Sequence, residues 1–133
     1  KYHGRQCGRL IGWLAYYCAK TPGLEPSPDT TVMFDVGNEP QPDALLFTPQ
    51  FAGGQTKLDE DGYIVGAPEL VAEVSGSTVS KDMHDKLNAY RRNGVREYIV
   101  WRVASRSSTQ LSLGSCSNGC AIRIRIKTLG WRP

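Results

Sequence analysis

A strand, a helix and a second strand follow one another in the middle of the chain, and this unit most constrains the fold. Residues 69–75 and 97–103 are apolar runs of strand length. Residues 80–93 lie between them with apolar side chains at helical spacing, and Gly94 follows as expected of a helix C-terminus. Such a unit predicts two parallel strands joined by a right-handed crossover.

The rest of the chain adds another helix and more strands. Apolar side chains recur at helical spacing in residues 4–19, which predicts an amphipathic helix. Residues 31–36 and 43–48 are predicted strands that could pair as a hairpin, and the alternating residues 121–127 predict an edge strand. Segments rich in Pro, Gly or Asp are predicted loops: residues 26–29 and 49–62. The predicted fold class is α/β, with a mixed central sheet flanked by helices.

Length and hydropathy restrict the class of protein. The 133 residues suffice for one domain. The chain has no apolar run of the roughly 20 residues that a membrane helix needs. It begins with Lys1 rather than Met and shows no signal-peptide pattern. We therefore expect a truncated start, no membrane association and a cytoplasmic location.

The net charge of +3 comes from the C-terminal segment alone. Residues 104–133 contain five basic residues and no acidic one, which leaves 11 basic and 13 acidic residues in the rest of the chain. The basic balance is therefore no sign of a nucleic-acid-binding face on the predicted core.

The cysteines match no common metal framework. There are four of them: Cys7, Cys18, Cys116 and Cys120. None forms a CxxC pair, and His3 and His84 do not complete a zinc pattern. The last two cysteines could form a loop disulfide or none. A Cys-based metal or redox domain remains one hypothesis, and it requires the thiols to lie close together.

Two carboxylates occupy positions where surface charges are unusual. Asp43 opens an apolar strand after Pro42, and Glu73 lies inside the run 70–74. A buried, ionised carboxylate needs a metal ion, a basic partner or a raised pKa. The ordinary alternatives are an edge strand that turns Glu73 to water and a turn residue that caps a loop at Asp43.

Lys86 is the cation that could serve these carboxylates. It lies four residues after Asp82, so the two share one face of the predicted helix 80–93. The ordinary interpretation is a surface ion pair worth a few tenths of a kcal/mol, about the usual size for exposed pairs. The more specific one is that Lys86 reaches Glu73 and stabilises charge on a phosphate. Tyr90 and Tyr98 are predicted core aromatics, with a ligand role as the minor alternative.

Several motifs in order resemble the Uma-two family of the PD-(D/E)XK nuclease superfamily. The specific part is the run 66–74, then Asp82-x3-Lys86-x3-Tyr90, then residues 93–98. Pro42-Asp43 and the Gly-Gly-Gln at 53–55 also match, and the resemblance extends over about residues 3–103.

This resemblance implies a restriction-endonuclease-like core and metal-dependent hydrolysis of phosphodiester bonds. Asp43 and Glu73 would be the metal ligands for Mg²⁺ or Mn²⁺, and Lys86 the catalytic cation. Asp82 would assist Lys86 or join the site. Ser75 stands where the superfamily usually has its lysine, so Lys86 would replace it from the following helix. The implied partner is nucleic acid, with DNA expected over RNA, and a homodimer stays open.

A catalytically inactive nuclease-like scaffold, or a relic that binds DNA or a protein partner, is the alternative function. Convergence of Asp43, Glu73 and Lys86 in space would favour the nuclease over this alternative. In the first helix, residues 1–20 contain no Asp or Glu, although many superfamily members place an acid there.

The predicted domain division is a nuclease-like core at 1–103 and an atypical basic tail at 104–133. The tail is Ser-rich and without acids, as a frame-shifted or divergent end would be. An intact alternative reading frame in the DNA around codon 104 would support a frameshift. A single frame shared by relatives would contradict it.

Overall fold

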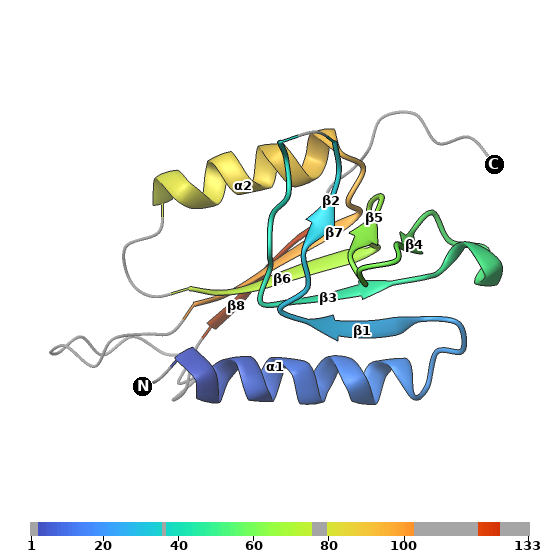
Figure 1. Ribbon diagram of the computed structural model, residues 1–133. Helices are drawn as coiled ribbons and strands as arrows, with labels where there is room; N and C mark the ends of the chain where they lie inside the picture. The colour runs from blue at the N-terminus through green and yellow to red at the C-terminus, as the bar shows by residue number, and fades with distance from the viewer. Residues whose placement is uncertain (1–2, 36, 76–79, 103–119, 126–133) are drawn as a thin grey trace, which may run out of the picture.

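A five-stranded mixed sheet with one helix on each face forms the centre of the molecule (Figure 1). The computed structural model describes residues 3–35, 37–75, 80–102 and 120–125, with the side chains of 80–83 and 120–125 left aside. Helix α1 is His3–Cys18 and helix α2 is Ser80–Arg92. The sheet has the order β1-β3-β6-β7-β8. Its strands are β1 (Glu25–Pro28), β3 (Ala44–Phe47), β6 (Leu70–Ser75), β7 (Glu97–Arg102) and β8 (Cys120–Arg125).

The strand–helix–strand prediction is confirmed. Strands β6 and β7 pair in parallel, from Leu70 opposite Glu97 to Ser75 opposite Arg102, and α2 connects them. Helix α1 agrees with the helix predicted at 4–19 to within one residue at each end. The α/β class with a mixed central sheet is therefore correct.

The hairpin predicted between residues 31–36 and 43–48 is wrong. Strand β3 pairs instead with β1, antiparallel, with Pro26 opposite Leu46. Strand β2 (Val32–Met33) joins a small second sheet with β5 (Ile64–Val65) and β4 (Lys57–Leu58). The proline-rich segment 26–29, predicted to be a loop from its composition, lies largely in β1. It forms a strand here because β1 lies at the sheet edge, where the missing donors can face away from the sheet.

The C-terminal strand prediction is confirmed at the edge of the sheet. Strand β8 pairs antiparallel with β7, and its bounds are one to two residues earlier than the predicted 121–127. This strand lies beyond Val103, yet it belongs to the same sheet as β6 and β7. The division of the chain into a core and a tail stays a prediction.

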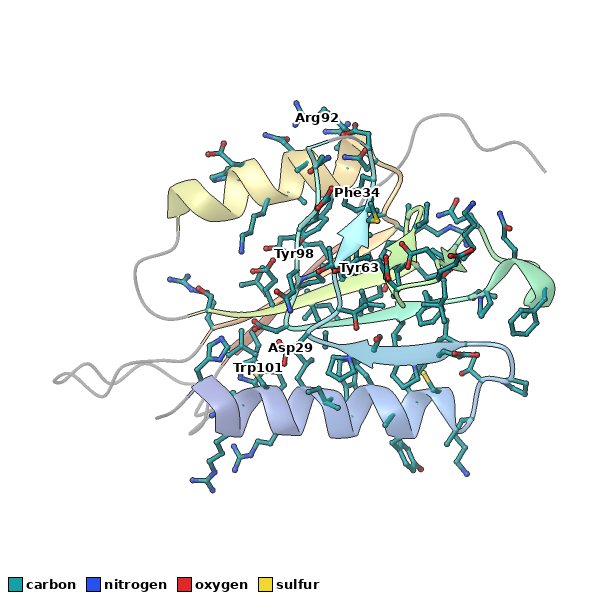
Figure 2. All side chains as sticks on the ribbon, in the orientation of Figure 1. Asp29, Phe34, Tyr63, Arg92, Tyr98 and Trp101 are labelled. Carbon is teal, nitrogen blue, oxygen red and sulfur yellow. The ribbon has the colours of Figure 1, made fainter. Side chains whose placement is uncertain are left out.

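Two apolar clusters lie on the two faces of the sheet, and the alternation of side chains along β6 between them shows which face Glu73 occupies. On the α1 face, Leu70, Ala72 and Val74 of β6 pack in the cluster that includes the α1 leucines. On the α2 face, Val71 packs in the other cluster, with Tyr90. Figure 2 shows Phe34 and Tyr98 between α2 and the sheet, and Trp101 on the α1 side. Because successive side chains alternate, Glu73 shares the α2 face with Val71.

Among the described residues, no helix is long and apolar enough to cross a bilayer.

The predicted loop 49–62 is more tightly built than its composition suggests. It contains the short helix η1 (Gln50–Ala52), and Thr56 is fully buried, with its hydroxyl donating to the Thr48 carbonyl at 2.8 Å. A Cβ added at Gly54 would lie 1.7 Å from that same carbonyl oxygen. Only glycine fits there without displacing the backbone.

We expect Gly54→Ala to lower the free energy of unfolding by about 2 kcal/mol or more, because backbone must move to admit the methyl group. Urea denaturation measures this change. The matched control is Gly12→Ala, because nothing lies within 4 Å of a Cβ added at Gly12 in helix α1. That control should be stabilised by about 0.5–1 kcal/mol. Equal stability of Gly54→Ala and the parent would contradict the packing described for this loop.

Candidate active site

Glu73 is the centre of a cluster of polar side chains on the α2 face of the sheet. Its Oε2 accepts a hydrogen bond from Lys86 Nζ at 2.6 Å, and its Oε1 accepts one from the Tyr90 hydroxyl at 2.9 Å. The Glu73 side chain is 14% exposed, and that of Lys86 is 41% exposed. The carboxylate is therefore mostly removed from water and compensated by a cation and a hydroxyl donor.

The position of β6 in the sheet excludes the edge-strand alternative for Glu73. Strand β6 lies between β3 and β7 and pairs with both. The ammonium of Lys86 contacts Glu73, as the more specific interpretation of this lysine expects. The side chain of Asp82 lies outside the described residues, so its role stays a prediction.

Helix α2 delivers both partners of Glu73 from one face. Lys86 and Tyr90 are four residues apart, which places them on the same side of the helix, one turn from each other. Helix α2 connects the parallel strands β6 and β7 and packs on the same face of the sheet as Glu73 (Figure 1). The lysine therefore reaches from the helix to a carboxylate on the strand that precedes it.

Tyr90 is a core residue whose hydroxyl also donates a hydrogen bond to Glu73. It is 1% exposed, and its ring packs against Phe34 and Tyr98 at centroid distances of 6.2 and 5.1 Å. Burial raises the pKa of the Tyr90 hydroxyl well above its usual range, and the charge of Glu73 adds to the effect. The hydroxyl thus stays protonated and donates. Its place in the core confirms the sequence prediction, and the minor alternative, a role as a ligand, stays a prediction.

Asp43 lies immediately before β3, the strand that pairs with β6. The first residue of β3, Ala44, lies opposite Ala72, which precedes Glu73 on β6. Asp43 Oδ2 accepts a hydrogen bond from the Val74 backbone N–H at 2.6 Å. The side chain is 20% exposed. Asp43 therefore does more than cap a loop: its carboxylate is fixed against the strand that carries Glu73.

The two carboxylates suit a hard divalent cation. Asp43 directly precedes β3 and Glu73 lies on β6, the strand paired with β3. Each side chain is largely but not fully buried, and each oxygen keeps a lone pair beyond the hydrogen bonds described. Carboxylate oxygens are the donors that Mg²⁺ and Mn²⁺ prefer. Asp43 and Glu73 thus meet the chemical requirement for the metal predicted from the sequence.

A second group of polar atoms meets Asp43 from helix α1. The Nε2 atom of His3 lies 3.5 Å from Asp43 Oδ1, and Cys7 Sγ lies 3.3 Å from His3 Nδ1. Burial raises the pKa of the Cys7 thiol to about 11, and the negative charges of Asp43 and Asp29 contribute. The sequence patterns of the cysteines and histidines did not predict this group, because they match no common metal framework. The four-residue spacing of His3 and Cys7 on one helix face was the signal that could have joined them.

The hypothesis of a domain built on cysteines alone receives no support from the described thiols. Cys7 and Cys18 are both free, and they lie in the first and last parts of α1. Eleven residues of helix separate them by about 16 Å. Cys116 and the side chain of Cys120 lie outside the described residues.

Comparison with known proteins agrees with the geometry. A family model named Uma2, with the description "Putative restriction endonuclease", matches residues 1–127. The match extends past Val103, where the resemblance was expected to end, and includes β8. No curated protein matches the chain.

A solved structure shares the fold. The crystal structure of a "putative nuclease belonging to DUF820" from Anabaena variabilis superposes with a TM-score of 0.57 at 15% sequence identity. The alignment covers 77% of this chain and 57% of that one, so the chain spans little more than half of that protein's length. At this identity the likeness concerns the fold.

We expect Tyr90→Phe to lower the free energy of unfolding by about 1–2 kcal/mol, because it removes a hydrogen bond to a charged group and keeps the ring. Thermal or urea denaturation measures the loss. The control is Tyr16→Phe, because Tyr16 is 67% exposed and should change stability by less than about 0.5 kcal/mol. A Tyr90→Phe variant as stable as the parent would show that the hydroxyl does not hold Glu73.

Proposed function

The chain belongs to the Uma2 family, described as "Putative restriction endonuclease", and from this membership we propose that it is a metal-dependent endonuclease that cleaves DNA. The observation that carries the proposal is the contact of Lys86 with Glu73 on the central strand β6, where the next residue, Val74, binds the Asp43 carboxylate through its backbone N–H. Carboxylates can bind the hard cation of a metal-assisted hydrolysis, and an adjacent lysine can stabilise the charge that develops on the phosphate.

Asp43 and Glu73 are the proposed ligands of Mg²⁺ or Mn²⁺. Such an ion supplies Lewis acidity toward a phosphate oxygen and lowers the pKa of a bound water. Within the chain, the hydrogen bond from Val74 N–H fixes one oxygen of Asp43, and the Tyr90 hydroxyl fixes one oxygen of Glu73. These contacts hold the two carboxylates in place before a substrate binds, which reduces the reorganisation that catalysis requires.

Lys86 is the proposed catalytic cation. Its ammonium is 2.6 Å from Glu73, and 41% of its side chain is exposed, so it can reach a phosphate that approaches from solvent. There it would orient the attacking water and stabilise negative charge that develops on the phosphate. Ser75, two residues after Glu73 on β6, offers no such charge, which supports assigning the role to the helix residue.

An inactive nuclease-like scaffold is the alternative, and one observation favours it. Both oxygens of Glu73 already accept hydrogen bonds from within the chain, from Lys86 and from Tyr90. A carboxylate satisfied in this way could be purely structural, and the protein would then bind DNA or a partner without cleaving. A homodimer and a cytoplasmic location stay predictions under either function.

We expect the parent protein to cleave supercoiled plasmid and duplex oligonucleotides with Mg²⁺ or Mn²⁺, and we expect EDTA to abolish this cleavage. The variants Asp43→Asn, Glu73→Gln and Lys86→Met should each lose at least about 100-fold in rate, the usual effect of removing a group that stabilises developing charge. An RNA oligonucleotide of the same sequence distinguishes the two nucleic acids.

The control for Lys86→Met is Lys57→Met, because Lys57 is an exposed lysine on strand β4. That variant should cleave at the parent's rate. Cleavage that survives Glu73→Gln would place the activity elsewhere or in a contaminant. A well-folded parent that cuts neither DNA nor RNA with either ion would establish the scaffold alternative.

A further inference from the structure

His3, Cys7 and Asp43 form a group that differs in chemistry from the carboxylate pair. One atom from each of the three residues lies within 4.8 Å of the others. We propose that these three residues bind a borderline-soft divalent cation of the Zn²⁺ class, with the fourth position open to water. This site shares Asp43 with the proposed hydrolytic centre, whereas His3 and Cys7 belong to this site alone.

The interatomic distances approach those of a metal centre. Bond lengths of about 2.0 Å to nitrogen and oxygen and 2.3 Å to sulfur place two ligands of a tetrahedral zinc roughly 3.3–3.8 Å apart. His3 Nε2 lies 3.5 Å from Asp43 Oδ1 and 4.0 Å from Cys7 Sγ. The exposed His3 side chain can move to bring all three ligand atoms, which lie within 4.8 Å of one another, to bonding distance of one ion.

The elements that carry the ligands hold them together. His3 and Cys7 are four residues apart in α1, so both project from one face at its first turns. Two ligands at this spacing on one helix are a common basis of zinc sites. Asp43 comes from the sheet that α1 covers, and the Val74 N–H occupies its Oδ2. This leaves Oδ1, the oxygen nearest His3, as the ligand, with its orientation fixed by a second contact.

Charge also favours a divalent cation at this position. A thiol that coordinates a metal ion is deprotonated. A thiolate and a carboxylate then neutralise the two charges of the metal, while neutral His3 adds the third bond.

The donor atoms select the class of metal. A set of one sulfur, one nitrogen and one oxygen favours Zn²⁺ over Mg²⁺, whose preference is for oxygen alone. The His3 side chain is 57% exposed, which leaves the solvent side of the site accessible to an entering ion. Since Asp43 is also a proposed ligand of the hydrolytic metal, zinc binding would compete for this carboxylate. Only that consequence rests on the proposed function.

Co²⁺ is the spectroscopic probe for this site, added to the metal-free full chain without a polyhistidine tag. Replacing Cys18, Cys116 and Cys120 with serine leaves Cys7 as the sole thiol. We expect this variant to bind one Co²⁺ with a thiolate-to-metal charge-transfer band, and Zn²⁺ but not Mg²⁺ to abolish the band. Further replacement of Cys7 with serine should remove the band. Its absence while Cys7 is intact would overturn the proposal.

Matched variants test the other ligands in the same background. His3→Ala should weaken Co²⁺ binding by at least about tenfold, as loss of groups in a metal site usually does. His84→Ala should leave it unchanged, because His84 is the chain's other histidine and lies exposed on α2. Glu73→Gln should also retain the charge-transfer band, because Glu73 is not a ligand of this site. The Co²⁺ test therefore stays informative even if the nuclease assay fails. Equal affinities of His3→Ala and His84→Ala would contradict the site.

Alkylation of the unmodified chain gives a second measurement that needs no serine variant. Zn²⁺ should slow the reaction of Cys7 with iodoacetamide at least several-fold, as read from the mass of the Cys7 peptide. Cys18, on the same helix, is the internal control and should react at an unchanged rate. Equal effects of Zn²⁺ on both cysteines, or none on either, would overturn the proposal.

Discussion

The Glu73 carboxylate on the central strand is the constraint to which the surrounding polar contacts respond. An ionised group on an inner strand is costly unless charge and hydrogen bonds compensate it. Here Lys86 and Tyr90 from α2 engage its two oxygens, while Asp43 is fixed to the next residue of β6. A purely structural core does not need such a group, because apolar residues of similar size would often stabilise the fold equally well. The cluster is therefore better explained by chemistry than by stability.

Much of the fold and of the candidate site follows from local patterns. The strand–helix–strand unit was predictable because β6, α2 and β7 each have a clear period and a clear boundary. Lys86 could be paired with Glu73 from the sequence, because the crossover must place the helix over the strand that precedes it. The position of Asp43 at the start of one apolar run and of Glu73 inside another was sufficient to mark both as unusual.

The rest depended on contacts between distant segments, which no local pattern encodes. Strand β1 contains two prolines, and only its place at the sheet edge makes it a strand. Strand β2 pairs with β5, more than 30 residues later, so its hairpin with β3 could not be excluded from the sequence. The meeting of His3 and Cys7 with Asp43 likewise requires α1 to pack across the sheet.

We propose that Asp43 and Glu73 together hold a divalent cation, and anomalous diffraction from a crystal of the full chain soaked in Mn²⁺ is the direct test. We expect a manganese peak bonded to oxygens of both carboxylates at roughly 2.0–2.2 Å, beside the Lys86 ammonium. A well-ordered map with no peak there, and with Glu73 still bound by Lys86 and Tyr90, would contradict it.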